Sequence, residues 1–142
     1  MKLFLDTSVL LAASGSASGA SRAVIDLAQP NKWLLISSPY CIAETTANIR
    51  KLSASAPPIW RSRIRSRLQV VADSIVFDKP LAFQKAKDKP VLITALASGC
   101  NYLLTLDRVD FALFMSAPVY GLRVHTPAMF LETMRAHGRL VE

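Results

Sequence analysis

The stretch that decides the fold is MKLFLDTSVLL, residues 1–11 of the 142-residue chain. Residues 3–5, Leu-Phe-Leu, form a short apolar run typical of a buried strand, and residues 6–8, Asp-Thr-Ser, favour the start of a helix. Asp6 therefore stands where a strand ends. Because ligands of an open α/β sheet bind outside the carboxyl ends of its parallel strands, this position predicts a site residue rather than a core residue.

Three later acids stand in comparable positions. Glu44 lies in a helical pattern that follows a strand, Asp88 precedes a helical pattern, and Asp107 follows a strand-like run. With Asp6 they predict one cluster of carboxylates. Carboxylates within a few ångströms of one another repel unless a proton or a cation intervenes, and a hard divalent cation prefers oxygen ligands. The cluster therefore favours Mg²⁺ or Mn²⁺ and phosphodiester hydrolysis, in which such a cation activates water and stabilises developing negative charge.

Strand-like and helix-like segments alternate, which predicts one α/β domain over residues 1–142 with a mainly parallel sheet. A flexible loop rich in serine and glycine is expected at 14–19, close to the site. Ser21 is expected to cap the helix that follows, and Pro30-Asn31 to end it. We expect the later strands at 33–36, 74–77, 102–104 and 121–125, and later helices starting near Ser38, Val91, Phe111 and Thr126.

The helix after Ser38 carries one of the candidate acids. Ile42, Ile49 and Leu52 recur at helical spacing and mark its expected buried side. At about 100° per residue, Glu44 lies away from that side and so faces either solvent or the site. An ordinary solvated glutamate is the alternative interpretation.

The chain is basic and rich in apolar residues. Seventeen Lys and Arg against ten Asp and Glu give a net charge of +7, and hydrophobic residues make up 51% of the chain. This composition excludes a largely disordered protein, and the charge favours an anionic partner such as nucleic acid. Simple solubility is the alternative explanation of the charge.

A basic amphipathic helix is expected after the Pro-containing break at 53–58. Apolar residues recur at helical spacing from Trp60 to Val71. Arginines alternate with them without an acid nearby in the sequence, which is consistent with a surface that binds nucleic acid or an acidic protein partner; a merely solvated face is the alternative interpretation. These arginines are Arg61, Arg63, Arg65 and Arg67.

Cysteine use and hydropathy indicate a reduced, cytoplasmic protein. Cys41 and Cys100 lie in apolar helical patterns, where cysteine behaves as a small buried residue. Asp6 interrupts the apolar segment that a secretion signal needs, and no stretch reaches the length of a membrane span. His125 and His137 lack the spacing of zinc ligands.

The order and spacing of these motifs resemble the PIN-domain nucleases, particularly the short bacterial ribonuclease toxins called VapC-type. The resemblance covers nearly the whole chain and rests on Leu5-Asp6-Thr7-Ser8-Val9-Leu10, Ser38-Pro39 with Ala43-Glu44, Asp88 before Val91-Leu92-Ile93-Thr94-Ala95-Leu96-Ala97, and Leu104-Thr105-Leu106-Asp107 followed by Asp110-Phe111. It implies a single three-layer α/β/α domain, an RNA substrate, a homodimer and a cognate antitoxin that covers the site.

The resemblance also implies roles for individual residues. Thr105 would orient or hydrogen-bond the last acid. The chain departs from the family pattern at two places. Lysines surround Asp88, where an acidic neighbourhood is expected, and the stretch at 14–20 consists of small residues that offer little substrate-specific chemistry. The implied catalytic residues are Asp6, Glu44, Asp88 and Asp107, the cation ligands are Asp6, Asp88 and Asp107, and the supporting residues are Thr7, Ser8, Thr105 and Asp110.

Two other functions fit the same sequence. One is a catalytically inactive module of this fold that binds nucleic acid or regulates another protein; the acidic quartet speaks against it, because a pure binder has no reason to place negative groups against phosphate. The other is a nuclease of RNA processing rather than a toxin, which the sequence does not separate from the toxin.

Overall fold

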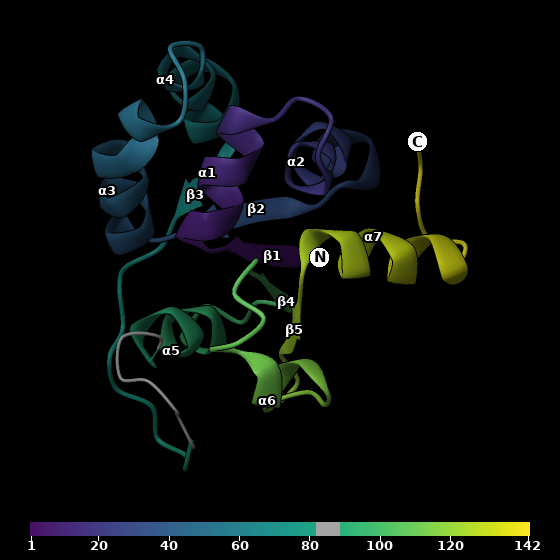
Figure 1. Ribbon diagram of the computed structural model, residues 1–142. Helices are drawn as coiled ribbons and strands as arrows, with labels where there is room; N and C mark the ends of the chain where they lie inside the picture. Colours follow the sequence, from purple (N-terminus) through teal and green to yellow (C-terminus); the bar gives the residue numbers. More distant parts are fainter. Residues whose placement is uncertain (82–88) are drawn as a thin grey trace.

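The computed structural model describes residues 1–81 and 89–142 as five parallel strands with helices around them (Figure 1). The strand order is β3-β2-β1-β4-β5, and every pair of neighbours is parallel. This confirms the predicted α/β class. The strands are β1 (Lys2–Leu5), β2 (Leu34–Ser37), β3 (Gln69–Val70), β4 (Tyr102–Leu104) and β5 (Arg123–His125).

Helices cover both faces of the sheet, which gives the three α/β/α layers that the family resemblance implied. In Figure 1, α1 to α4 lie on one face and α5 and α6 on the other, while α7 lies beside α2. The helices are α1 (Thr7–Gly15), α2 (Ala20–Asn31), α3 (Pro39–Asn48), α4 (Ala56–Ile59), α5 (Lys89–Ala97), α6 (Ala112–Met115) and α7 (Pro127–Ala136). Short turns of other helical types follow α3 and α4 at Ile49–Lys51, Trp60–Ile64 and Arg65–Arg67.

The first strand is central because it is apolar on both faces. Phe4 is fully buried and aligns with Ile36 on β2 and Leu103 on β4. A continuous apolar run is what a parallel strand covered by helices on both sides requires. The strand leads directly into the polar residues at 6–8, so the apolar core and the polar edge are set by the same short segment.

Polar caps start three of the helices at the carboxyl edge of the sheet. Asp6 follows β1 and accepts a hydrogen bond from the Thr7 N–H at 2.7 Å. Ser38 follows β2 and caps α3, and Thr126 follows β5 and caps α7. A side-chain oxygen that binds a free N–H of the first turn stabilises a helix start, typically by about 1 kcal/mol. Capping therefore gathers polar side chains at this edge.

The third strand was predicted wrongly at 74–77. It is formed instead by Gln69 and Val70, which align with Ile36 and Ser37 of β2. The Ser74 main chain exchanges hydrogen bonds with the hydroxyl of Thr94 on α5, at 2.9 and 3.3 Å. The side chain of a helix residue thus binds main-chain groups that a strand would pair with its neighbour. The apolar composition of this segment was misleading, because its valine and isoleucine are exposed.

Two helix details also differ from the sequence-based expectations. Helix α2 starts at Ala20, with Ser21 inside the first turn rather than capping it, whereas its end at Asn31 agrees with the predicted stop at Pro30-Asn31. Of the expected isoleucine-leucine stripe, Ile49 is buried and Ile42 packs partly buried against the core, but Leu52 is exposed; the buried residues within α3 itself are Cys41 and Thr45. The α-helix ends at Asn48 and a 3₁₀ turn follows, so helical spacing no longer holds beyond that point.

Both cysteines are free and buried, as expected. Burial raises the pKa of the Cys100 thiol to about 11. Across the described ranges, no helix combines the length and apolar character that crossing a bilayer requires.

Candidate active site

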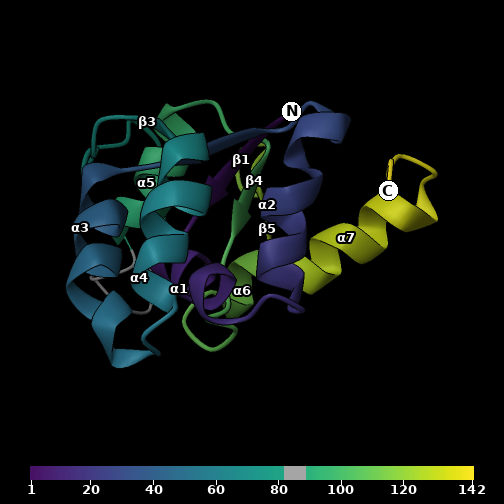
Figure 2. The ribbon, with the colours of Figure 1, turned by 90° about the horizontal axis from the view of Figure 1, so that it is seen from above.

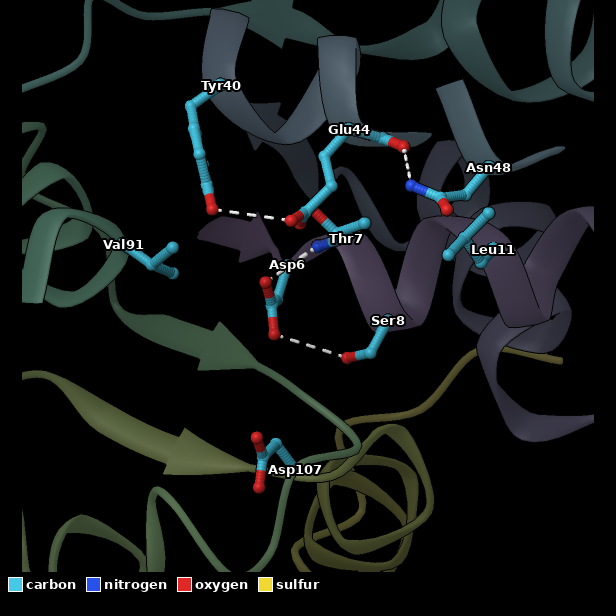
Figure 3. Close-up of a pocket in the computed structure, with 9 residues that line it drawn as sticks. All are labelled: Asp6, Thr7, Ser8, Leu11, Tyr40, Glu44, Asn48, Val91 and Asp107. Atoms are coloured by element: carbon cyan, nitrogen blue, oxygen red, sulfur yellow. Dashed lines mark hydrogen bonds between the residues drawn. The ribbon is translucent and has the colours of Figure 1, made fainter. Parts of the chain in front are cut away.

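A pocket of about 280 Å³ opens where the carboxyl ends of the strands meet the helices (Figure 3). Three of the four predicted acids line it, although they come from distant parts of the sequence: Asp6 after β1, Glu44 on α3 and Asp107 on the loop after β4. Asp88 lies outside the described residues. The remaining lining residues are Thr7, Ser8, Leu11, Tyr40, Asn48 and Val91.

Asp6 is held by hydrogen bonds to both carboxylate oxygens. Its Oδ1 accepts from the Thr7 N–H, and its Oδ2 accepts from the hydroxyls of Thr105 at 2.8 Å and Ser8 at 3.2 Å. Burial raises the pKa of Asp6, and the nearby charge of Glu44 raises it further, while the three hydrogen bonds oppose the rise. A negative charge is therefore costly at Asp6, and the neighbouring groups fix its orientation.

Thr105 links the two aspartates of the pocket. Besides donating to Asp6, its hydroxyl accepts a hydrogen bond from the Asp107 N–H at 3.1 Å. It thus contacts the main chain of Asp107 and the carboxylate of Asp6, rather than the carboxylate of the last acid. The Asp107 Oδ1 accepts from the Asp110 N–H at 2.9 Å. Asp110 is buried and does not line the pocket, and its main-chain N–H contacts Asp107.

Removing the Thr105 hydroxyl is expected to destabilise the protein. Thr105 is fully buried, so Thr105→Val leaves the Asp107 N–H without this acceptor at a cost of about 1–3 kcal/mol. Thr105→Ser keeps the hydroxyl and should lose less. Urea unfolding of the two variants measures the difference, and equal stability of Thr105→Val and the parent protein would show that the hydroxyl contributes nothing.

Glu44 faces the pocket from α3, with two neighbours that were not predicted. The Tyr40 hydroxyl donates to Glu44 Oε2 at 3.3 Å, and the Asn48 side-chain amide donates to the Glu44 carbonyl at 2.7 Å. The Glu44 charge raises the pKa of Tyr40. Residues 40, 44 and 48 are spaced four apart and share one helix face. That spacing is a sequence signal which could have found both neighbours.

The oxygen-rich lining suits a hard divalent cation. Figure 3 shows Asp6 between Glu44 and Asp107, and a cation near them would relieve the burial and charge repulsion that raise the Asp6 pKa. Across residues 1–81 and 89–142, however, no three His, Cys, Asp or Glu side chains are grouped closely enough to hold a metal. The pocket thus offers suitable donors without a closed set of protein ligands, and neither His125 nor His137 lines it.

The four predicted arginines are all exposed, but they lie in two different environments. Arg63 forms an ion pair with Asp26 of α2 at 3.1 Å, and Arg67 lies 3.9 Å from the same carboxylate. The expectation that no acid neutralises the group is therefore wrong for this pair. Arg61 and Arg65 line a separate pocket of about 380 Å³ together with Arg50.

Comparison with protein-family models identifies the family of this chain. The family model described as PIN domain matches residues 2–109, which include Asp6, Glu44 and Asp107. The chain belongs to the PIN-domain family. No curated protein sequence matches the chain significantly.

Solved structures resemble this PIN domain in fold at low sequence identity. One is VapC20 of Mycobacterium tuberculosis, described as a sarcin-ricin loop cleaving toxin, with a TM-score of 0.51, 17% identity, and coverage of 78% of this chain and 94% of that chain. Another is VapBC2 from Rickettsia felis, bound to a DNA fragment from their promoter, with a TM-score of 0.59, 18% identity, and coverage of 89% and 98%. At these identities the similarity shows the fold.

Proposed function

We propose that this protein is an Mg²⁺- or Mn²⁺-dependent endoribonuclease whose catalytic residues are Asp6, Glu44, Asp88 and Asp107. The observation that carries the proposal is the shared pocket: three of these carboxylates line it in a PIN-domain chain, although they are far apart in sequence. Crowded carboxylates without a cation would repel the phosphates of RNA. The net charge of +7 on the whole chain supports an anionic substrate.

In this proposal Asp6, Asp88 and Asp107 hold the cation, which stabilises negative charge and lowers the pKa of bound water when present. The protein's own residues position these acids. Thr7, Ser8 and Thr105 fix both oxygens of Asp6, and Asp110 fixes Asp107 through its N–H. Glu44, which the Tyr40 hydroxyl holds, orients the attacking water by accepting its hydrogen bond.

We further propose that the nuclease is a VapC-type toxin, that it acts as a homodimer in the cytoplasm, and that a cognate antitoxin inhibits it. The support is the fold similarity to one structure described as a toxin and to another described as VapBC2 bound to promoter DNA. An RNA-processing nuclease and an inactive binding module are the competing functions.

Expression in a bacterial host separates these three functions. A toxin should arrest growth and cleave cellular RNA, and Asp6→Asn should abolish both effects at equal protein levels. A processing nuclease should cleave RNA without arresting growth. An inactive module should do neither, and growth curves indistinguishable between parent and Asp6→Asn, together with intact cellular RNA, would reject the proposal.

Two arginine pairs on one helical segment provide matched variants for RNA binding. Arg61→Gln with Arg65→Gln removes guanidinium groups that have no ion pair with any described residue, whereas Arg63→Gln with Arg67→Gln removes groups paired with Asp26. Each phosphate contact contributes a slope of about −0.7 in log affinity against log salt for single strands. The first pair should flatten this slope more than the second. Equal effects of both pairs would contradict the prediction that the unpaired arginines contact RNA more strongly than those paired with Asp26.

A further inference from the structure

A second pocket lies next to the candidate active site, across the loop that carries Asp107. Its volume is about 300 Å³, and Leu106 and Arg108 line it, whereas Asp107 between them lines the active-site pocket. The Leu106 N–H donates to the Ser8 hydroxyl at 3.0 Å, which ties this loop to the active site. The two pockets are therefore neighbours separated by a short stretch of chain.

The start of helix α2 forms one wall of the second pocket. Its N-cap is Gly19, which has no side chain to accept a hydrogen bond, and the N–H groups of Ala20, Ser21 and Arg22 have no acceptor among the described residues. Free N–H groups and the helix dipole make such an end attractive to anions. The helices α1, α3 and α7, in contrast, use side-chain caps from Asp6, Ser38 and Thr126.

A side chain without a protein partner at the same place independently indicates a ligand. Ser21 is only 5% exposed and lines the pocket, yet no described residue forms a hydrogen bond with its side chain. The residue is largely buried, but its oxygen is not one of the described polar atoms that are sealed from solvent without a partner, so a ligand in the pocket can reach it. A ligand with acceptor oxygens in this pocket would supply a partner.

The charges around the pocket are positive. Arg108 is exposed, and no described carboxylate pairs with it. Arg22, in the first turn of α2, is 5% exposed and donates to the Ala13 carbonyl without an acidic partner in the described ranges. Helix α7 also starts here: Thr126 and Ala128 line the pocket, and Figure 2 shows α2 and α7 beginning side by side. Among the described residues, no acid lines the pocket.

We propose that this pocket, formed by the start of α2 with Ser21 and Arg108, binds a phosphate of the RNA strand next to the phosphate that is cleaved. We call it the α2 phosphate subsite. The inference rests on the proposed function, since a strand that enters the active-site pocket carries a phosphate at every nucleotide and must place others nearby. The loop at 106–108 then lies between two neighbouring phosphates of one strand.

Gly19→Asp is the sharpest test variant. Gly19 has φ −80° and ψ 163°, which an Asp N-cap also adopts, and an added Cβ would approach the Ser16 Oγ only to 3.4 Å. The new carboxylate should therefore cap α2 and raise the thermal midpoint, while it occupies the free N–H groups and repels phosphate. Arg108→Gln is the second variant. Arg139→Gln, beyond the far end of α7, is its matched control and removes the same charge.

Binding is measured in the Asp6→Asn background, with chelator, so that the RNA stays intact. Short single-stranded RNA is titrated by fluorescence anisotropy across salt concentrations. Gly19→Asp and Arg108→Gln should each weaken binding about tenfold, as expected for one hydrogen bond to a charged group, and flatten the salt slope by about 0.7. Arg139→Gln should retain the binding of the background protein. In parallel, inorganic phosphate should raise the thermal midpoint of the background protein more than that of Gly19→Asp.

The outcomes separate this subsite from the proposed function. If the background protein binds RNA and Gly19→Asp and Arg108→Gln leave affinity and salt slope unchanged, the subsite is wrong while the nuclease proposal stands. Stabilisation by phosphate without any effect of the variants on RNA indicates a free-phosphate site and also overturns it. If neither RNA nor phosphate binds the background protein, the subsite is rejected, and absence of cleavage by the parent protein would separately reject the nuclease.

Discussion

Asp6→Asn is expected to stop RNA cleavage and, at the same time, to make the metal-free protein more stable. The substitution removes a proposed cation ligand, and loss of one group that stabilises transition-state charge costs about 100- to 1000-fold in rate. Asn keeps an oxygen for the Thr7 N–H and therefore still caps α1. It also removes a charge that burial and Glu44 make unfavourable.

The stability gain should depend on pH in a defined direction. Because the pKa of Asp6 is raised in the folded state, the folded protein binds the Asp6 proton more strongly than the unfolded chain does. The free-energy cost of the Asp6 charge to the folded protein is absent below the ordinary pKa of Asp and fully present above the raised pKa of the folded state. Urea unfolding in chelator should therefore show Asp6→Asn more stable at pH 7, with the gain vanishing in acid. A variant less stable than the parent at pH 7 would contradict this account of Asp6.

The second large effect is stabilisation of the parent protein by metal. A cation that binds only the folded state adds about 2.7 kcal/mol at a hundred times its dissociation constant, which corresponds to roughly 6–10 °C for a domain of this size. Mg²⁺ or Mn²⁺ should raise the thermal midpoint by this order, and Asp6→Asn and Asp107→Asn should reduce the gain.

Glu132→Gln is the matched control for these variants, because it removes an exposed carboxylate on α7 that does not line the pocket. Its midpoint should rise with metal as much as that of the parent. Equal metal responses in the parent, the two aspartate variants and the control would show that the cation binds elsewhere.

Local sequence predicted the centre of the fold because the relevant forces act over a few residues. The run at 3–5 is apolar on both faces, and Asp6 is followed directly by a helix that it caps. The segment at 74–77 looked like a strand for the same reason, but its main chain is bound by Thr94 from a distant helix. Which apolar run occupies the edge of a sheet depends on such tertiary contacts, and composition does not reveal them.

In the candidate site, too, some features were predictable from the sequence and others depend on tertiary contacts. The topology rule for parallel strands predicted that Asp6, Glu44 and Asp107 would lie together, and all three line one pocket. The expectation that no acid neutralises the four arginines is wrong, because Arg63 forms an ion pair with Asp26, which is near in space but distant in sequence. The open start of α2 was likewise not visible in the sequence, where Ser21 looked like a cap.

The most direct measurement is cleavage of end-labelled single-stranded RNA by the purified protein, with Mg²⁺ or Mn²⁺ added to metal-free samples or withheld by a chelator. Asp6→Asn, purified in the same way, reveals any contaminating ribonuclease. We predict that the parent cuts the RNA internally only when metal is present, and that Asp6→Asn shows only background. Equal cleavage by parent and Asp6→Asn, or cleavage by the parent that persists in chelator, would contradict a metal-dependent nuclease centred on Asp6.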